Sequence, residues 1–310
     1  MSLRAEILRL GTRYLFKGKP GPEASLAERR RRAIAVQRWV PNPPPDIKRI
    51  AVDAGGVSAE WVVAPTSQPD RHILYLHGGG YVIGSPSLYR HLTWRLAKAA
   101  RARLLAIDYR LAPEHPFPAA LDDAATAYEW LLASGADARE IAIIGDSAGG
   151  GLVFAVLLRC RDDGRVPLPA AAVALSPWTD LALTGASLAE NVAADPFLDA
   201  NGIPPIAEYY LAGADPRNPY ASPLYGDPTG LPPALIQVGS DEVLRDDATR
   251  MANRLRAAGC EVVLEIWPRM PHVWHLFASV MPEARHAIAR IGIFVAERTT
   301  VTAASQPPCG

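Results

Sequence analysis

The sequence has few cysteines and no excess of charge of either sign, and each of these absences excludes a class of protein. Cys160, Cys260 and Cys309 are the only cysteines in 310 residues, and they lie far apart. Neither a disulfide framework nor a zinc site is therefore expected, and a reducing compartment fits this usage. Lysine plus arginine and aspartate plus glutamate both number 32. Because binding to nucleic acids needs an excess of positive charge, no nucleic-acid partner is expected.

Long apolar runs are also missing. No uninterrupted apolar stretch approaches the ~18 residues that a membrane-spanning helix needs. At the N-terminus, Arg4 and Glu6 stand where a secretory signal would have its apolar stretch. We therefore expect no stable membrane insertion and a cytoplasmic protein.

Short apolar runs, bounded by glycine, proline or polar residues, alternate with longer segments of helical spacing. The runs predict buried strands at 73–76, 104–107, 141–144, 171–175, 235–238 and 262–266. The longer segments predict helices at 86–100, 118–134, 148–160, 245–258 and 281–297. This alternation implies a mostly parallel sheet with helices on both faces. Two earlier runs, at 50–52 and 61–63, predict an antiparallel edge to the same sheet.

Two segments fall outside this alternation. Residues 1–40 have the spacing of amphipathic helices and end in a proline-rich stretch at 41–45. Residues 182–222 interrupt the alternation and are interpreted as an irregular helical insertion.

A serine follows the predicted strand at 141–144. The segment Gly145-Asp146-Ser147-Ala148-Gly149 joins this strand to the predicted helix at 148–160. A serine at such a turn projects its hydroxyl above the sheet edge, and small flanking residues let the turn close. This strand–turn–helix context, more than the common Gly-x-Ser-x-Gly pattern, indicates that Ser147 is a nucleophile. Cys160 ends the apolar helix and is interpreted as a packing residue.

A serine hydroxyl is a weak nucleophile, so an acid and a histidine are expected downstream, in that order. The acid candidate is Asp241, which follows the predicted strand at 235–238, because the carboxyl ends of parallel strands form the ligand-binding edge of a sheet. Glu242 is its nearest rival. Capping of the next helix, the alternative role for Asp241, can fall to Asp246 or Asp247.

The base candidate is His272, in the loop after the last predicted strand. Pro271 precedes it and places it in a loop rather than in the core. His275, three residues further on, is interpreted as a residue of a helix start or a pocket wall.

A glycine-rich stretch follows the predicted strand at 73–76. Acyl transfer builds negative charge on the former carbonyl oxygen, and preorganised backbone N–H groups stabilise it. We expect these donors, the oxyanion hole, from Gly78, Gly79 and Ala148. His77 is interpreted as a structural hydrogen-bonding residue. Phosphate binding is the competing interpretation, but the stretch lacks a following Gly-Lys-Ser/Thr and a complete Gly-x-Gly-x-x-Gly. No metal or organic cofactor is expected.

Taken together, these segments resemble the hormone-sensitive-lipase family of α/β-hydrolases, known in bacteria as family IV. The motifs at 77–80 and 145–150 carry the resemblance, with further matches at 108–120, 176–181 and 220–224. The segments at 241–246 and 270–272 occupy the family's acid and base positions. The family's acid segment often reads Asp-Pro-Leu-x-Asp, and here Glu242-Val243 stands in place of the single proline. This comparison still favours Asp241.

The resemblance implies an α/β-hydrolase fold: a mostly parallel eight-stranded sheet flanked by helices, with a helical cap. Residues 1–45 and the insertion at about 182–222 would form the cap, 46–300 the catalytic domain, and 301–310 a flexible tail. The implied activity is that of a cofactor-free serine carboxylesterase acting on short- to medium-chain acyl esters. An amidase, lactonase or deacetylase would use the same residues. A non-catalytic receptor on this fold is disfavoured, because serine, acid and histidine are all present.

Aromatic residues near these motifs are candidates for the substrate pocket. We expect Tyr81, Asp146, Tyr209 and Trp274 to contribute to it, together with Tyr210 and the apolar face of the N-terminal helices. The expected partner is a small-molecule ester. A homodimer through the last strand and helix is the expected assembly, because an uncovered edge strand tends to pair.

Overall fold

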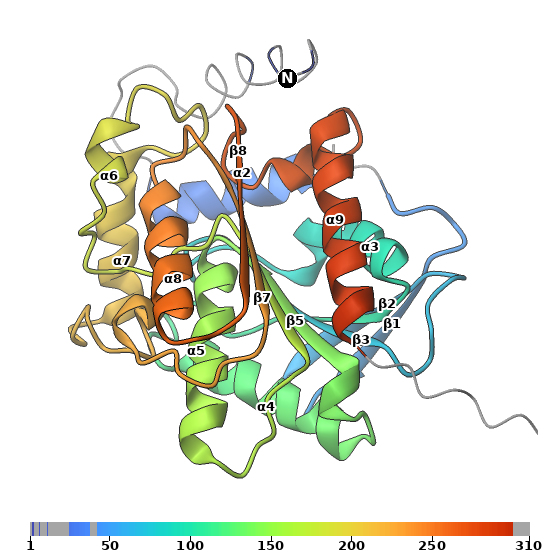
Figure 1. Cartoon of the computed structure of the whole chain (residues 1–310). Coiled ribbons are helices and arrows are strands. Elements are labelled where there is room, and N and C mark those ends of the chain that lie inside the picture. Colours follow the sequence, from blue (N-terminus) through green and yellow to red (C-terminus); the bar gives the residue numbers. More distant parts are fainter. Residues whose placement is uncertain (1, 3–5, 7–10, 12–24, 38–41, 300–310) are drawn as a thin grey trace, which may run out of the picture.

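The computed structural model describes residues 2, 6, 11, 25–37 and 42–299. Its centre is an eight-stranded sheet in the order β1-β2-β4-β3-β5-β6-β7-β8 (Figure 1). β2 is antiparallel to β1 and β4, and the other neighbours are parallel. The strands are β1 (Lys48–Asp53), β2 (Ser58–Val63), β3 (His72–Leu76), β4 (Arg103–Ile107), β5 (Ile141–Asp146), β6 (Ala171–Leu175), β7 (Ala234–Gly239) and β8 (Val262–Trp267). The predicted mostly parallel sheet with an antiparallel edge is confirmed.

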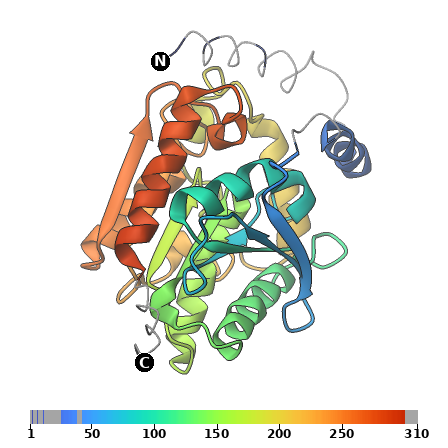
Figure 2. The same cartoon turned by 90° about the vertical axis from the view of Figure 1, so that its right-hand side faces the viewer.

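Helices cover both faces of this sheet (Figures 1 and 2). α3 (Pro86–Ala100) and α9 (Pro282–Arg298) pack side by side on one face, where they enclose an apolar core with the sheet. α4 (Ala119–Ala133), α5 (Ala148–Asp163) and α8 (Arg245–Ala257) enclose a second core on the opposite face. All five helices lie where the sequence predicts them.

The central strands explain why the sequence shows continuous apolar runs. β3, β5 and β6 are buried along their whole length, because helices cover both faces of the sheet there. β1, at the edge, is mostly exposed. The carboxyl ends of β5, β6 and β7 meet at one edge of the sheet, which is where ligands bind in folds of this kind.

The chain leaves the strand–helix alternation between β6 and β7, in the segment predicted to be an insertion. This segment contains α6 (Ser187–Glu190), η2 (Ala200–Gly202), α7 (Ile203–Leu211) and η3 (Pro223–Tyr225). In Figure 1, α6 and α7 lie beside α8 at the left of the molecule.

One helix of the predicted N-terminal cap is described, α2 (Leu26–Gln37). Arg30 attaches it to the segments at 82 and 112–114. Its Nε donates to the carbonyl oxygen of Val82 at 2.7 Å and its Nη2 to that of Ala112 at 2.8 Å. Its guanidinium also pairs with Glu114. Most of residues 1–45 and all of the predicted tail, 301–310, lie outside the described residues, so the domain limits stay predictions.

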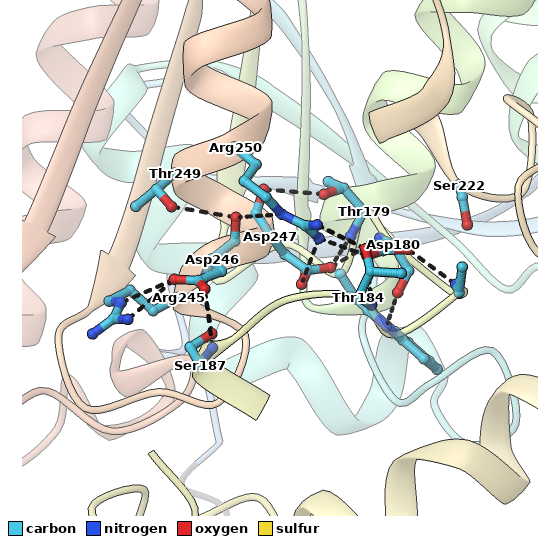
Figure 3. A network of polar contacts seen from close by, with 12 residues as sticks. Thr179, Asp180, Thr184, Ser187, Ser222, Arg245, Asp246, Asp247, Thr249 and Arg250 are labelled. Carbon is cyan, nitrogen blue, oxygen red and sulfur yellow. Dashed lines mark hydrogen bonds and ion pairs between the residues drawn. The ribbon is translucent and has the colours of Figure 1, made fainter. Parts of the chain in front are cut away.

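A buried carboxylate network joins the beginning of the insertion to α8 (Figure 3). Asp180 Oδ2 accepts a hydrogen bond from Arg250 Nη2 at 2.5 Å. Asp247 Oδ2 accepts from the backbone N–H groups of Thr179 and Asp180, at 2.8 and 2.9 Å. Both carboxyl groups are fully buried. Burial and the nearby charge of Asp180 raise the pKa of Asp247 to about 8, so this carboxyl group holds a proton at neutral pH.

We expect the protein to become less stable as the pH rises through about 8 and Asp247 loses this proton. The pKa of Asp247 is higher in the folded chain than in the unfolded chain. Between the two values the folded state binds one more proton, and stability therefore falls with rising pH. Asp247→Asn, which resembles the protonated form, should show a weaker fall. The measurement is the melting temperature from pH 6 to pH 9.

Asp246→Asn is the matched control, because Asp246 precedes Asp247 on the same helix. Its carboxylate pairs with Arg245 and accepts from the N–H of Ser187. The wild type and Asp246→Asn should share one slope. An equal slope in Asp247→Asn would contradict the assignment of the proton to Asp247.

Candidate active site

Ser147 lies at the turn from β5 to α5, as the sequence predicts. Its φ of 53° and ψ of −120° are strained for a residue with a side chain. Two glycines let this turn form. A Cβ on Gly145 would lie 2.2 Å from the carbonyl oxygen of Gly149, and a Cβ on Gly149 would lie 2.1 Å from that of Leu76. The strained turn raises the Ser147 hydroxyl above the sheet edge, where it is partly exposed.

His272 lies in the loop after β8 and reaches this hydroxyl. Its Nε2 is 2.9 Å from Ser147 Oγ. The ring is 3% exposed. Burial alone would lower the pKa of His272, but a hydrogen bond to Glu242 and the charge of that carboxylate raise it above 6.5. The structure therefore brings together the serine and the histidine that the sequence singles out.

The carboxylate beside His272 belongs to Glu242, and the expectation of Asp241 is wrong. Glu242 Oε2 is 2.8 Å from His272 Nδ1. The Glu242 side chain is fully buried, and its Oε1 accepts from the N–H of Gly239 at 2.5 Å. Asp241 makes a different contact and accepts from the hydroxyl of Ser240 at 2.8 Å.

A signal for Glu242 was present in the sequence. The stretch Glu242-Val243-Leu244-Arg245-Asp246 matches Asp-Pro-Leu-x-Asp without a gap when glutamate replaces the first aspartate and valine the proline. Beginning the match at Asp241 requires an inserted residue. The prediction of Asp241 puts the type of acid before the gap-free match and is therefore one residue off.

The predicted oxyanion hole needs a second correction, at Gly78. The N–H of Gly78 donates to Asp146 Oδ1 at 3.0 Å, so it is not free to bind a substrate oxygen. Among the described residues, none accepts a hydrogen bond from the N–H groups of Gly79, Gly80 or Ala148. Gly79 has a φ of 108°, and a Cβ there would lie 1.9 Å from the carbonyl oxygen of Ile83. This turn therefore requires glycine.

The other two histidines near the motifs are structural. His77 is buried, its ring is stacked on Tyr109 with centroids 4.1 Å apart, and its Nδ1 lies 2.7 Å from the carbonyl oxygen of Gly78. Burial lowers the pKa of His77 to about 4. His275 lies in η4 (Trp274–Phe277), where its Nε2 is 2.7 Å from Gln237 Oε1, and burial lowers its pKa to about 3. No hydrogen bond joins either ring to Ser147, and their partners are Gly78 and Gln237.

The four residues expected to line the pocket have different surroundings. Tyr81 is buried and stacked on Tyr210, with ring centroids 3.8 Å apart. Trp274 is fully buried in the core beneath α3 and α9, so its assignment to the pocket is wrong. Asp146 is also buried, and its Oδ1 accepts from the hydroxyl of Tyr75 at 2.5 Å. Tyr209 is exposed on α7.

The insertion contributes residues to the site that sequence reasoning missed. Three of its polar side chains hold the loop that carries Glu242. Ser187 Oγ donates to the carbonyl oxygen of Val243 at 2.7 Å, Asn191 Nδ2 donates to that of Glu242 at 2.8 Å, and Asp195 Oδ2 accepts from the N–H of Val243 at 3.0 Å. The ring of Phe197 lies beside His272, with centroids 6.1 Å apart. No motif in the sequence marks these positions.

A groove of about 700 Å³ lies between α2 and the segment that follows the glycine loop. Its apolar lining comes from Ile34, Ile83, Leu88 and Leu111, and Arg30, Glu114 and His115 add polar groups. Among the described residues, no cluster of three histidine, cysteine or carboxylate side chains is arranged to hold a metal ion. Every helix that the structure describes is too short or too polar to cross a membrane.

Comparison with known proteins places this geometry in one family. Residues 73–276 match the family model described as the alpha/beta hydrolase fold. An acetyl-hydrolase from Streptomyces hygroscopicus is 51% identical over 257 residues, which cover 83% of this chain and 84% of the relative. An esterase from Acinetobacter venetianus is 35% identical over 254 residues, which cover 82% of each.

Solved structures agree with these relatives. An esterase from the bacterial hormone-sensitive lipase family matches with a TM-score of 0.92 and 45% identity, over 97% of this chain and 99% of that one. The esterase EstE5, soaked with p-nitrophenyl butyrate, matches with a TM-score of 0.92 and 44% identity, over 96% and 99% of the two chains.

Proposed function

This chain belongs to the α/β-hydrolase family and, within it, to the esterases of the hormone-sensitive-lipase group, and we propose that it hydrolyses small carboxylic esters through Ser147, His272 and Glu242. One observation carries the assignment of residues. The three side chains form an unbroken hydrogen-bonded series, with 2.9 Å between Ser147 and His272 and 2.8 Å between His272 and Glu242.

In the first step, His272 removes the proton of the Ser147 hydroxyl as its oxygen attacks the ester carbonyl. The contact with Glu242 keeps the hydrogen of the neutral imidazole on Nδ1, so Nε2 is free to accept the proton. Glu242 then stabilises the imidazolium that forms. His272 gives the proton to the departing alcohol, and water hydrolyses the acyl-enzyme by the same route.

The oxyanion hole in this proposal is formed by the N–H groups of Gly79, Gly80 and Ala148. These three N–H groups lie near Ser147, and none of them has an acceptor among the described residues. Ala148 is the first residue of α5, so the positive end of the helix dipole adds to its effect. Gly78 serves a different purpose, because its bond to Asp146 fixes the loop against the end of β5.

We infer an ester with short or medium chains. The groove beside α2 adjoins the glycine loop through Ile83, whose N–H donates to the carbonyl oxygen of Gly79 at 3.0 Å, and its apolar part suits an alkyl chain. Phe197 offers a partly exposed ring next to His272. The soaking of EstE5 with p-nitrophenyl butyrate supports the choice of a butyrate ester as a first substrate. Amide and lactone bonds are the alternatives to compare with it, because preference among leaving groups depends on pocket shape.

The expectations for assembly and location stay predictions. β8 ends the sheet on one side, and Ile266 on it and Ile293 on α9 are 45% and 56% exposed. We propose this surface as the contact of a homodimer. A cytoplasmic location is likewise proposed, from the sparse cysteines.

Covalent labelling tests the proposed function. A fluorophosphonate probe should modify Ser147, because the probe needs an activated serine and an oxyanion hole. Peptide mapping by mass spectrometry locates the modified residue. In parallel, p-nitrophenyl esters from acetate to decanoate should be hydrolysed faster than a matched anilide and a lactone. Labelling elsewhere, or none in folded protein, would overturn the proposal, and preference for the anilide or the lactone would change the reaction class.

A further inference from the structure

One short segment at the end of β6, residues 175–178, makes hydrogen bonds to Ser147, to Glu242 and to the residue that follows His272. The carbonyl oxygen of Leu175 accepts from the N–H of Ser147 at 2.8 Å, and the N–H of Trp178 donates to the carbonyl oxygen of Ser147 at 2.9 Å. Between these two residues, Ser176 extends its side chain toward Glu242 and the loop of His272. The mechanism above uses no atom of this segment.

The Ser176 hydroxyl makes two hydrogen bonds whose directions are fixed. It accepts from the N–H of Val273 at 3.1 Å, because a backbone N–H can only donate. Its own hydrogen is then available for Glu242 Oε1, which lies 2.8 Å away. The serine thus connects the carboxylate that faces His272 with the residue directly after His272.

Ser176 and Val273, the two residues joined by this hydrogen bond, both have strained backbones. Ser176 has a φ of 45° and Val273 a φ of 47°, in the left-handed region that side-chain-bearing residues avoid. For a β-branched residue such as Val273 this is a marked outlier. The backbone of Ser176 is also held, since its N–H donates to the carbonyl oxygen of Gln237 at 2.7 Å. Strain of this kind persists where surrounding contacts enforce it, often at functional sites.

We propose that Ser176 is a positioning residue of this active site, whose hydroxyl holds the carboxylate of Glu242 and the loop of His272 in register. The inference rests on the proposed function, since it assigns a role in the same reaction. The hydroxyl binds Oε1, and this leaves Oε2 to face His272 Nδ1. The Ser176 hydroxyl and the N–H of Gly239 both donate to Oε1, and together they stabilise the negative charge of Glu242.

Loss of the hydroxyl should lower kcat and change the pH dependence. The loss in kcat comes from misplacement of Glu242 and the loop of His272, and displacements of about 1 Å correspond to about 10-fold to 100-fold in rate. The charged groups acting on His272 are Glu242, Asp195 and Asp146. Without Ser176 Oγ more of the Glu242 charge acts on the imidazolium, so the acid limb of the kcat/KM profile should move to higher pH. KM should change less than about threefold, because Ser176 does not touch substrate.

The experiment compares Ser176→Ala and Ser176→Gly with the wild type. Both variants lack the hydroxyl, and only glycine relieves the backbone strain at this position. Ser222→Ala is the matched control, because Ser222 is also fully buried and its hydroxyl accepts from a backbone N–H, that of Leu181, at 2.8 Å. The measurements are kcat and KM for p-nitrophenyl butyrate across pH, melting temperature, and the downfield proton resonance of His272 Nδ1–H.

Equal losses of kcat in Ser176→Ala and Ser176→Gly, with a raised acid limb and a shifted Nδ1–H resonance, are the expected result. Ser222→Ala should keep the wild-type profile. The inference would be overturned if kcat and the acid limb were unchanged in both Ser176 variants. It would also be overturned if Ser176→Gly alone behaved like the wild type, because the effect would then come from the backbone. The NMR resonance reports on the contact even where activity is low. Absence of esterase activity in the wild type would instead count against the proposed function.

Discussion

Replacing Glu242 with glutamine is expected to lower kcat about 10³-fold to 10⁴-fold, while Asp241→Asn stays within about threefold of the wild type. The amide of glutamine is neutral and cannot stabilise the imidazolium of His272. It also presents an N–H₂ group that favours the hydrogen on Nε2, the nitrogen that must accept the proton of Ser147. Asp241 bonds to Ser240 instead, so its charge is not part of this series. The measurement is kcat for p-nitrophenyl butyrate at a pH on the plateau.

The two neighbouring substitutions serve as controls for each other. Both remove one negative charge from the same loop and keep the side-chain length. A large loss in Asp241→Asn together with a small loss in Glu242→Gln would reverse the correction and restore the acid favoured by the sequence. Glu242→Asp adds a graded test, because it keeps the charge but shortens the side chain by one methylene. It should fall between the wild type and Glu242→Gln.

Replacement of Ser147 or His272 with alanine should have the largest effect, about 10⁵-fold to 10⁶-fold on kcat. Ser147 supplies the attacking oxygen, and His272 is the only ring within hydrogen-bonding distance of it among the described residues. Because the two residues act as one unit, the double variant should be hardly slower than either single variant. Active-site titration with the fluorophosphonate probe should be performed beside the kcat measurement, to exclude contaminating esterase.

His275→Ala provides the comparison for His272→Ala. Its ring bonds to Gln237 beneath the active-site loop, so its loss costs about 1–3 kcal/mol of stability with a much smaller loss of kcat. Circular dichroism and melting temperature establish that each variant is folded. Equal losses of kcat in the two histidine variants would contradict the assignment of the base.

The fold could be predicted because its signals are local and repeated. Strands buried on both faces must be apolar throughout, so β6 was predicted with its observed limits, Ala171–Leu175. Helix α3 was also predicted with its observed limits, since Pro86 suits a first turn and the apolar spacing ends at Ala100. Ser147 and His272 could be found because their neighbours in sequence, glycine and proline, mark the turns that present them.

The errors concern the direction in which side chains and N–H groups point. Asp241 and Glu242 are adjacent in a turn. The gap-free match to the family's acid segment favours Glu242, but the path of the turn decides which carboxylate points inward. The N–H of Ser240 bonds to Trp267, which continues the pairing of β7 with β8 by one residue and turns Glu242 toward His272. The prediction of Gly78 fails because its N–H donates to the carboxylate of Asp146, which lies 68 residues away in sequence.

The contacts between the insertion and the loop that carries Glu242 bear on how this enzyme can be re-engineered. They are made by Ser187, Asn191 and Asp195. An insertion of this kind is an attractive unit to exchange between relatives in order to alter substrate range. In this chain, however, the same unit supports the backbone around Glu242. A chimera that replaces residues 187–195 would change the catalytic acid's support along with the pocket. Libraries for altered selectivity are therefore better directed at α7 and the groove beside α2, with those three positions kept.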